Sequence, residues 1–590
     1  MSRRKISKSQ KPQGVAPWRR RAVVILLGVS AVLVAGRAFQ LQVIDRDFLT
    51  REGAKRQVRT VTLPGHRAAI RDRRGEPLAL SAPVDSLWCV PSELLGAPEH
   101  LAALAKVLKQ PKSKLTRFLT ARSKRQFVYL ERGMPPDEAR RALALKAPGV
   151  FSIREYRRYY PAGEVAGQLV GFTNVDGKGQ EGMEMAHNES LSGIAGSRHV
   201  IRDARGRIVE DTEEAVPAQP GEDLTLSIDL RLQYLAYREL KATVKKHEAK
   251  GGLVVVADAR TGEILAMASQ PGFNPNNVAD RRPGRMRNRP IVDSFEPGSA
   301  VKPLLVAQAL ETGAYREQSR IDTGDGWMQV RRLTVKDIHA LGDTDLTMIL
   351  AKSSNVGAAK IGLHIGAENV WQGYQRFGLG DPVGSGFPGE SMPLLRNYMK
   401  WGDIATATAS YGYGLSLNGL HLVRAYAGLA NDGLMPHLQL LANQPLTPGR
   451  RAVSAATARS VRHMLEAVAV DGGTGSRAAI PGYRVAGKTG TVRKVSPTGG
   501  YDAHRHQSVF VGMVPADNPR LVGLVMVDEP RAGDYYGGVV AAPIFSSVMQ
   551  GALRLLQIAP DDCASECAQP DVLPQIAMPA GASPATGPRS

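Results

Sequence analysis

The sequence has few cysteines and no motif typical of nucleic-acid binding. Its three cysteines, Cys89, Cys563 and Cys567, lack the spacing of a zinc or redox site, so we expect no metal and no cofactor. The last two could still form a local disulfide in an oxidising compartment. No helix-turn-helix, zinc-finger or RNP-type signature accompanies the net charge of +21. That charge therefore points to an anionic membrane or polymer, or to a solvated basic surface, rather than to nucleic acid.

Long apolar runs are absent except for one near the N-terminus. Residues 22–44 are apolar apart from a few positions such as Arg37, and as a helix of roughly 34 Å they would cross a bilayer. Residues 1–21 are basic and contain no acidic residue, which predicts a cytoplasmic N-terminus and an exported remainder. A cleaved signal peptide is the alternative, but no clear small-x-small cleavage site precedes Arg37.

With 590 residues the chain is too long for one core. We expect a basic, β-rich pedestal or dimerisation-type domain over 45–220, a second domain over 221–558, and a disordered tail rich in Pro, Ala and Gly over 559–590. In the pedestal the pattern predicts strands at Val58–Leu63 and Val165–Phe172 and a helix at Pro136–Leu145. No residue cluster there is typical of catalysis.

For the second domain the sequence pattern predicts a mixed α+β fold, in which helices pack on the faces of an antiparallel sheet. Two apolar runs joined by a glycine-containing turn predict a hairpin, and three strands follow far downstream. The predicted strands are Gly252–Asp258, Glu263–Ser269, Tyr483–Val492, Ser508–Val514 and Leu521–Val527. The predicted helices are Leu230–Lys246, Leu346–Ala351, Asn355–Ile365 and Ala541–Leu556.

Ser299 and Lys302 stand three residues apart at the predicted start of an apolar helix. This spacing places both side chains on one helix face, and Pro303 is tolerated only in a first turn. A serine needs a base to become a nucleophile, and a partly desolvated lysine could be neutral and serve as that base. Taken alone, the pair is more simply a solvated helix face.

Two further motifs carry suitable chemistry. Ser353 and Asn355 lie where one predicted helix ends and the next begins, so they could relay a proton and hold a substrate carbonyl, or simply cap a helix. Lys488, Thr489, Gly490 and Thr491 lie on a predicted strand, where an extended peptide could pair with the edge and its carboxylate could meet the lysine and the threonines. An edge strand protected by a lysine is the alternative.

In this order the three motifs resemble those of penicillin-binding proteins and serine β-lactamases. The chain is similar to class B penicillin-binding proteins, above all the division-specific peptidoglycan transpeptidases of Gram-negative bacteria. The resemblance runs from Arg19 to about Asp561 and rests also on Arg67–Ala79, Arg158–Glu164, Gly179–Glu184, Arg287–Gly298 and Asp534–Gly538. Ala300 departs from it, because members often carry threonine there, but the proposed proton transfers need no side chain at this position.

The resemblance implies a serine D,D-transpeptidase that forms an acyl-enzyme on Ser299 with the penultimate D-Ala of a stem peptide and completes a 4,3 cross-link. Lys302 would be the acylation base, Ser353 and Asn355 would organise proton transfer, and Lys488 to Thr491 would bind the carboxylate and the peptide. The backbone N–H groups of Ser299 and Thr491 would form the oxyanion hole. Weaker candidates for the cleft wall are Arg493, Tyr535 and Tyr536.

The same resemblance implies inhibition by β-lactams, an inner-membrane location with a periplasmic bulk at the division septum, and partnership with a membrane glycan polymerase and other division proteins. Alternatives are the elongation-specific transpeptidase, a D-Ala carboxypeptidase or β-lactamase, and a non-catalytic penicillin sensor or scaffold. His504 and His506 lack a third ligand with suitable spacing and are expected in a solvated loop.

Overall fold

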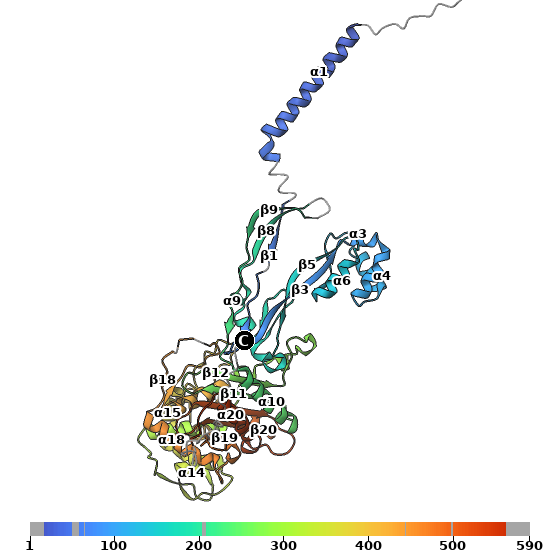
Figure 1. Ribbon diagram of the computed structural model, residues 1–590. Coiled ribbons are helices and arrows are strands. Elements are labelled where there is room, and N and C mark those ends of the chain that lie inside the picture. The colour runs from blue at the N-terminus through green and yellow to red at the C-terminus, as the bar shows by residue number, and fades with distance from the viewer. Residues whose placement is uncertain are drawn as a thin grey trace, which may run out of the picture. The chain divides into compact units, whose positions relative to one another are not determined.

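The structure is a computed structural model that describes residues 17–49, 58–63, 65–202, 208–442, 444–445, 447–496 and 499–561 (Figure 1). Its contacts divide the chain into two compact units that interleave along the sequence. Unit 1 comprises residues 1–66, 86–153 and 194–220, and unit 2 comprises 67–85, 154–193 and 221–590. The domain limits expected from the sequence stay predictions. Some predictions fall outside the described residues. They concern residues 1–16, Cys563, Cys567 and most of the tail that is expected to be disordered.

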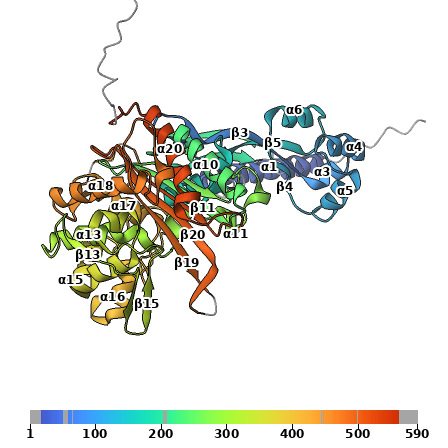
Figure 2. The ribbon, with the colours of Figure 1, turned by 90° about the horizontal axis from the view of Figure 1, so that it is seen from below.

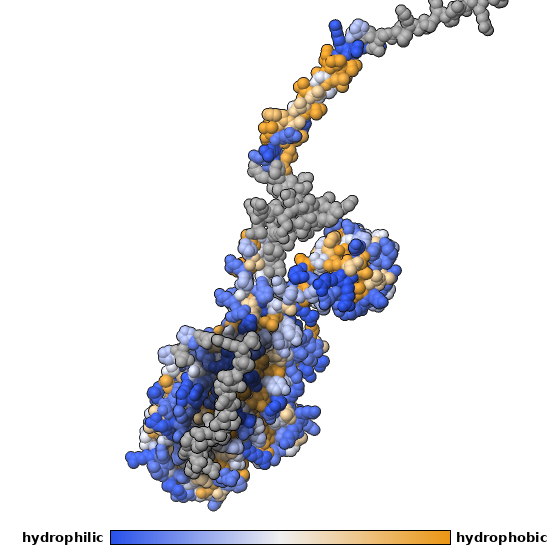
Figure 3. All heavy atoms as spheres, viewed as in Figure 1, coloured by the Kyte–Doolittle hydropathy of each residue, from blue (hydrophilic) through white to orange (hydrophobic). Residues whose placement is uncertain are grey.

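The apolar run near the N-terminus is helical. Helix α1 (Pro17–Phe39) continues as the π-helical turn η1 (Gln40–Ile44), giving 28 residues whose side chains are buried against no other part of the described chain. Figure 3 shows hydrophobic side chains along this helix. At 1.5 Å per residue it is about 42 Å long, enough to span a bilayer. The helix therefore has the length and composition of the membrane anchor predicted over 22–44.

The rest of unit 1 contains a three-stranded antiparallel sheet in the order β1-β8-β9, and a small helical subdomain around strand β4. Leucines of the subdomain helices pack on Leu87 and Cys89 to form a separate core. Strands β3 and β5 run from one unit into the other. The elements are β1 (Val58–Leu63), β3 (Pro77–Cys89), α3 (Pro91–Leu95), α4 (Pro98–Val107), α5 (Lys112–Thr120), β4 (Val128–Met134), α6 (Pro136–Ala144), β5 (Val150–Tyr159), β8 (Gly196–Arg202) and β9 (Ile208–Val216).

Unit 2 is built on a five-stranded antiparallel sheet in the order β12-β11-β21-β20-β19, which confirms the predicted fold class. The predicted hairpin is β11–β12, and the three late strands are neighbours with β19 at the edge. Figure 2 shows the far ends of β19 and β20 projecting from the body of the unit. The strands are β11 (Gly251–Asp258), β12 (Ile264–Gln270), β19 (Ala486–Val495), β20 (Tyr501–Val514) and β21 (Leu521–Asp528).

Helices cover both faces of this sheet. Because side chains on both faces are buried, the strand sequences are continuous apolar runs. Val254 and Val256 face a core shared with α10 and α20, whereas Leu253, Val255 and Ala257 face a larger core shared with α13 and α17. The longer helices are α10 (Leu230–Lys246), α13 (Lys302–Glu311), α14 (Leu346–Ala351), α15 (Asn355–Arg376), α16 (Asp403–Ser410), α17 (Gly419–Ala430), α18 (Ala455–Ala469) and α20 (Ala542–Leu555).

Shorter elements complete unit 2. They are β2 (Ile70–Arg71), η2 (Gly163–Val165), α7 (Gly167–Val170), β6 (Phe172–Thr173), β7 (Gly179–Glu181), α8 (Gly182–Ala186), α9 (Asn188–Ser192), β10 (Leu224–Thr225), η3 (Val278–Asp280), α11 (Pro283–Met286), α12 (Arg289–Val292), η4 (Gly298–Val301), β13 (Arg320–Asp322), β14 (Trp327–Val330), β15 (Leu333–Lys336), β16 (Asp343–Asp345), η5 (Tyr398–Lys400), β17 (Leu434–Met435), β18 (Arg450–Arg451), η6 (Ser476–Ala478) and α19 (Gly537–Val540).

The strand predicted at Val165–Phe172 is wrong. The segment forms the end of η2, the helix α7 and the start of β6. A short apolar run does not distinguish a buried strand from a buried helical turn. Gly171, whose φ is 78°, ends the helix and reverses the chain in a conformation that glycine adopts readily.

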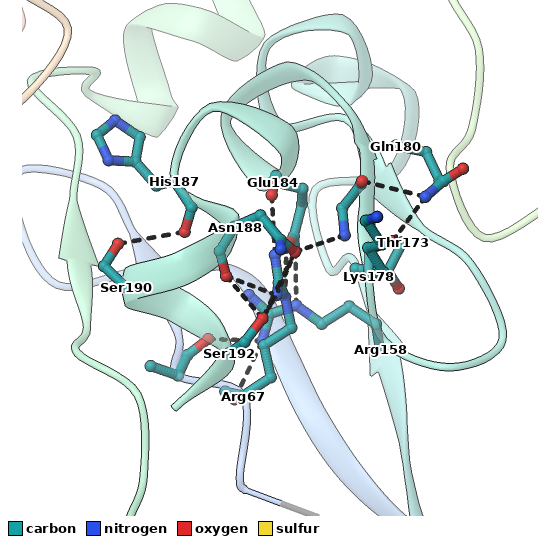
Figure 4. A network of polar contacts seen from close by, with 12 residues as sticks. Arg67, Arg158, Thr173, Lys178, Gln180, Glu184, His187, Asn188, Ser190 and Ser192 are labelled. Carbon is teal, nitrogen blue, oxygen red and sulfur yellow. Dashed lines mark hydrogen bonds and ion pairs between the residues drawn. The ribbon is translucent and has the colours of Figure 1, made fainter. Parts of the chain in front are cut away.

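A buried charge network joins three sequence motifs within unit 2 (Figure 4). Glu184 lies between two arginines: its Oε2 accepts from Arg67 Nε at 2.7 Å and its Oε1 from Arg158 Nε at 2.6 Å. Arg67 also donates to Asn188 Oδ1 and Ser192 Oγ, at 3.1 and 2.8 Å. The three charged side chains are at most 7% exposed. The network thus fixes the segment before β2 and the end of β5 to α8 and α9.

We expect Glu184→Ala to destabilise unit 2 by about 3–5 kcal/mol, because it leaves two buried arginines without their shared carboxylate. The free energy of unfolding of the full chain, measured by urea titration in detergent, would test this. Glu189→Ala in α9, which removes a carboxylate outside the network, should change it by less than about 0.5 kcal/mol. Equal effects of the two substitutions would contradict a structural role for the network.

Candidate active site

Ser299 lies where the chain enters a buried helix, as predicted. It belongs to the 3₁₀ turn η4, which runs directly into α13 with Pro303 in the first turn. Gly298 holds the turn in place: its φ is 52°, and its N–H donates to the carbonyl oxygen of Gly412 at 3.1 Å. The Ala300 methyl group is fully buried, and the carbonyl oxygen of Ala300 accepts from the Tyr426 hydroxyl at 2.8 Å. Alanine therefore fits this position.

Lys302 is fully buried and reaches the turn between α14 and α15. Its Nζ donates to the Ser353 carbonyl oxygen at 2.6 Å and to Asn355 Oδ1 at 2.8 Å, and lies 3.3 Å from Ser353 Oγ. Burial lowers the pKa of Lys302 well below its usual range, the charge of Lys488 lowers it further, and Asp337 opposes the shift. A neutral amine has two N–H groups, which the two carbonyl oxygens occupy, so its lone pair stays available for a hydroxyl proton.

Asp337, which the sequence reasoning missed, shapes this turn. It directly follows β15, and its carboxylate accepts from the Ser354 hydroxyl and from the backbone N–H groups of Asn355 and Val356, the last at 3.0 Å. Ser353 has a φ of 61°, an uncommon conformation for a residue with a side chain. The capping alternative also holds in part, because Ser354 is the N-cap of α15.

Lys488 lies on the edge strand β19 and is fully buried. Its Nζ lies 3.1 Å from the Thr489 carbonyl oxygen and 3.4 Å from Thr489 Oγ1, which in turn donates to Thr474 Oγ1 at 2.9 Å. Burial lowers the pKa of Lys488 to about 7. The ammonium group is therefore not exposed, and within the described residues its polar contacts are to Thr489. Thr474, between α18 and η6, is a second residue that sequence reasoning missed.

Gly490 brings the strand against the nucleophile turn. A Cβ atom at this position would lie 3.4 Å from the Pro297 carbonyl oxygen and 3.8 Å from the Ala300 nitrogen. At Gly490, β19 therefore passes η4 at a distance where a methyl group would make ordinary van der Waals contacts with the turn. The three predicted motifs meet in one place, although none of the three polar contacts of Lys302 is to Ser299.

Of the weaker candidates, Arg493 lies on β19, and Tyr535 and Tyr536 lie directly before α19. Arg493 is exposed, and its backbone N–H points to the Tyr413 hydroxyl at 3.5 Å. Tyr535 and Tyr536 stack with ring centroids 4.6 Å apart, and the next residue, Gly537, donates its N–H to Thr491 Oγ1 at 3.1 Å. Both tyrosines are over a third exposed.

The histidines expected in a loop lie in a strand instead. His504 and His506 belong to β20, which begins at Tyr501, and His506 is buried. Its ring stacks on Tyr535 with centroids 4.1 Å apart. The strand begins early because β19 pairs with it as far as Val495, a tertiary effect that the polar local sequence does not reveal.

Comparison with known families agrees with this geometry. Residues 252–550 match the model of the penicillin binding protein transpeptidase domain, and residues 62–226 match that of the penicillin-binding protein dimerisation domain. The chain belongs to the penicillin-binding protein transpeptidase family. Its two matched regions account for most of the two units.

Several members of this penicillin-binding family are similar to the chain over nearly their whole length. The probable peptidoglycan D,D-transpeptidase PbpC of Pseudomonas aeruginosa is 42% identical, covering 92% of this chain and 95% of the relative. The peptidoglycan D,D-transpeptidase FtsI of Escherichia coli is 40% identical, covering 94% and 96%. The solved structure of Mycobacterium tuberculosis penicillin-binding protein 3, complexed with aztreonam, is 26% identical with a TM-score of 0.66, covering 85% and 98%.

Proposed function

We propose that this peptidoglycan D,D-transpeptidase uses Ser299 as its nucleophile. Ser299 Oγ attacks the carbonyl carbon of the penultimate D-Ala of a donor stem peptide, an ester forms, and the peptide C–N bond breaks. The terminal D-Ala leaves with its amine. An amine of a neighbouring stem peptide then attacks the ester, and Ser299 regains its proton. The observation that carries this proposal is the fully buried Lys302 one helical turn from Ser299, whose pKa burial lowers well below its usual range.

In this proposal Lys302 takes the Ser299 proton, and Ser353 passes a proton to the leaving amine. The approach of Lys302 to Ser299 would tighten when substrate arrives, since catalytic hydrogen bonds are often long in unliganded sites. Asn355 orients the lysine, and the backbone N–H groups of Ser299 and Thr491 hold the developing oxyanion. Thr489, Gly490 and Thr491 receive the peptide along the free edge of β19.

Transpeptidation can be distinguished from hydrolysis by measuring the reaction products with and without an acceptor amine. Purified full-length protein is given a D-Ala-D-Ala donor with and without an amine-bearing acceptor stem peptide, and products are counted by mass spectrometry. We expect the cross-linked product to exceed the hydrolysed donor at millimolar acceptor. If the acceptor left the amount of hydrolysed donor unchanged, the protein would be a carboxypeptidase. Rapid turnover of penicillin would indicate a β-lactamase.

We further propose that the N-terminal helix anchors the protein in the inner membrane, with the basic tail in the cytoplasm and the bulk in the periplasm at the division septum. The helix would also offer a contact for a membrane glycan polymerase and other division proteins. The similarity to FtsI supports this assignment. Depletion should then give filamentous cells, whereas rounded cells would indicate the elongation-specific role.

The low pKa of Lys488 predicts a pH dependence of substrate binding. The lysine is cationic below about pH 7 and loses its charge as the pH rises. For a substrate with a free carboxylate, kcat/KM should fall by up to about tenfold per pH unit above this value, because kcat/KM reports the free enzyme. The same donor with an esterified carboxylate should lack this fall. Identical profiles for the two donors would contradict the role of Lys488.

A further inference from the structure

The hairpin β14–β15 of unit 2 is hydrogen-bonded to the turn that carries Ser353 and Asn355. The carbonyl oxygen of Lys336, the last residue of β15, accepts from Asn355 Nδ2 at 3.1 Å. The next residue, Asp337, binds the same turn through its carboxylate, and its own N–H donates to the Gly326 carbonyl oxygen at 2.8 Å. The hairpin therefore has a fixed place beside the proposed catalytic turn.

The two faces of this hairpin differ. Val330 and Val335 point inward and are buried in the larger core of unit 2. Residues that lie opposite each other across an antiparallel pair share a face. The outer face is formed by two such pairs, Trp327 with Lys336 and Gln329 with Thr334. All four side chains are exposed, Trp327 to 57%. The hairpin thus presents one aromatic ring among polar side chains to the solvent.

The polar side chains of the outer face hold one another in place. Gln329 Oε1 accepts from the Thr334 hydroxyl at 2.9 Å, and Gln329 Nε2 donates to the Arg331 carbonyl oxygen at 2.9 Å. A protein partner or a lipid surface would favour a contiguous apolar patch, which one indole ring among polar groups does not provide. A sugar ring fits this face better, because its C–H groups pack on the electron-rich face of tryptophan and its hydroxyls meet the polar rim.

The hairpin lies on the side of the site from which an acceptor can approach. In the proposed reaction the donor occupies the edge of β19, so the acceptor reaches the Ser299 ester from the opposite wall, which the Ser353 turn forms. The hairpin contacts α15 and α16, and Figure 2 shows β15 apart from β19 and β20. Trp327 lies one strand away from Lys336, about 5 Å, and is therefore close to the path of the acceptor.

The length of an acceptor stem peptide agrees with this position. The 4,3 cross-link places the attacking amine on the third residue of the stem, and the first residue is joined to a sugar of the glycan strand. Two residues therefore separate the amine-bearing residue from the sugar, which is about 7 Å of extended chain. The glycan of an acceptor is thus held a short distance from the Ser353 turn, where the outer face of the hairpin lies.

We propose that Trp327 stacks on a sugar ring of the glycan strand that carries the acceptor stem peptide, while Gln329, Thr334 and Lys336 contact the hydroxyl and amide groups of the sugar. Trp327 would contribute to acceptor binding without taking part in the bond changes, and would favour stems that belong to a glycan strand over free stem peptides. The inference rests on the proposed function, because the direction of the acceptor follows from the place of the donor on β19.

The test compares two acceptors with full-length protein in detergent. Both contain the same stem tripeptide, which has no D-Ala-D-Ala end and so cannot serve as a donor. One is free, and the other carries the peptidoglycan disaccharide. The donor is a D-Ala-D-Ala peptide without a sugar, and the cross-linked product is counted by mass spectrometry. The quantity compared is the ratio of kcat/KM values for the two acceptors, so a general loss of activity cancels.

We expect wild-type protein to prefer the disaccharide-linked acceptor at least fivefold. Trp327→Ala should lower this preference to less than twofold, whereas Trp327→Phe, which keeps an aromatic face, should retain more than half of it. Tyr234→Ala is the matched control, because it removes another exposed aromatic side chain, on α10. This variant should keep the wild-type ratio.

Three results would overturn the proposal: equal use of the two acceptors by wild-type protein, an unchanged ratio in Trp327→Ala, or the same loss in Tyr234→Ala as in Trp327→Ala. Failure of the proposed function gives a different result. In that case wild-type protein would form no cross-linked product with either acceptor, or Ser299→Ala would form as much as wild type.

Discussion

Ser299→Ala is expected to abolish covalent labelling by a fluorescent penicillin on a denaturing gel. The substitution removes the only oxygen that the proposed mechanism uses to open the β-lactam ring, and loss of a serine nucleophile costs on the order of 10⁶ in rate. Since Ser299 is only half-buried and its neighbours Gly298 and Ala300 hold the turn through backbone contacts, the fold should survive. Unchanged circular dichroism would verify this.

Ser319→Ala is the matched control, because it removes another serine hydroxyl of unit 2 in the loop after α13. This variant should label at the wild-type rate. Labelling of Ser299→Ala above background would mean that a different residue is acylated, and peptide mapping would identify it. If Ser299→Ala as the only copy supported normal growth, the non-catalytic scaffold function would be favoured.

The parts of the fold and site that could be predicted depend on local patterns. Pro303 and the apolar run after it locate the start of α13, and continuous apolar runs bounded by turn glycines locate the sheet strands. Each of these features acts within a few residues along the chain. The three motifs could be ordered into one site only through the resemblance to a known family, because spacing within a motif says nothing of contacts across 50 or more residues.

What could not be predicted depends on tertiary packing. Asp337 and Thr474 sit in loops without any periodic signal, and their partners Val356 and Thr489 are 19 and 15 residues away. The lowered pKa of Lys302 likewise follows from its complete burial beside Lys488. Lysine side chains are rarely fully buried, so the sequence alone gives no reason to expect this burial. These residues depart from local sequence rules at the proposed site, which is where such departures are expected.

Lys302 is the second position where a large loss is expected. In Lys302→Arg the side chain stays protonated at every accessible pH, and in Lys302→Gln it has no basic lone pair. Both variants should therefore slow the acylation of Ser299 by penicillin by about 10²- to 10⁴-fold, the usual contribution of a general base. The measurement is the second-order acylation rate constant from quenched time courses, expressed per folded protein.

Lys302→Gln is the more informative variant, because its amide can donate to the Ser353 carbonyl oxygen and Asn355 Oδ1, the contacts the lysine makes now. It therefore separates a base from a purely structural lysine. Lys246→Gln, at the exposed end of α10, controls for the loss of a positive charge and should acylate at the wild-type rate. If Lys302→Gln acylated as fast as this control while Ser299→Ala did not label, the Ser299 proton would have to go to another acceptor, and Lys302 would have a structural role in holding the Ser353 turn.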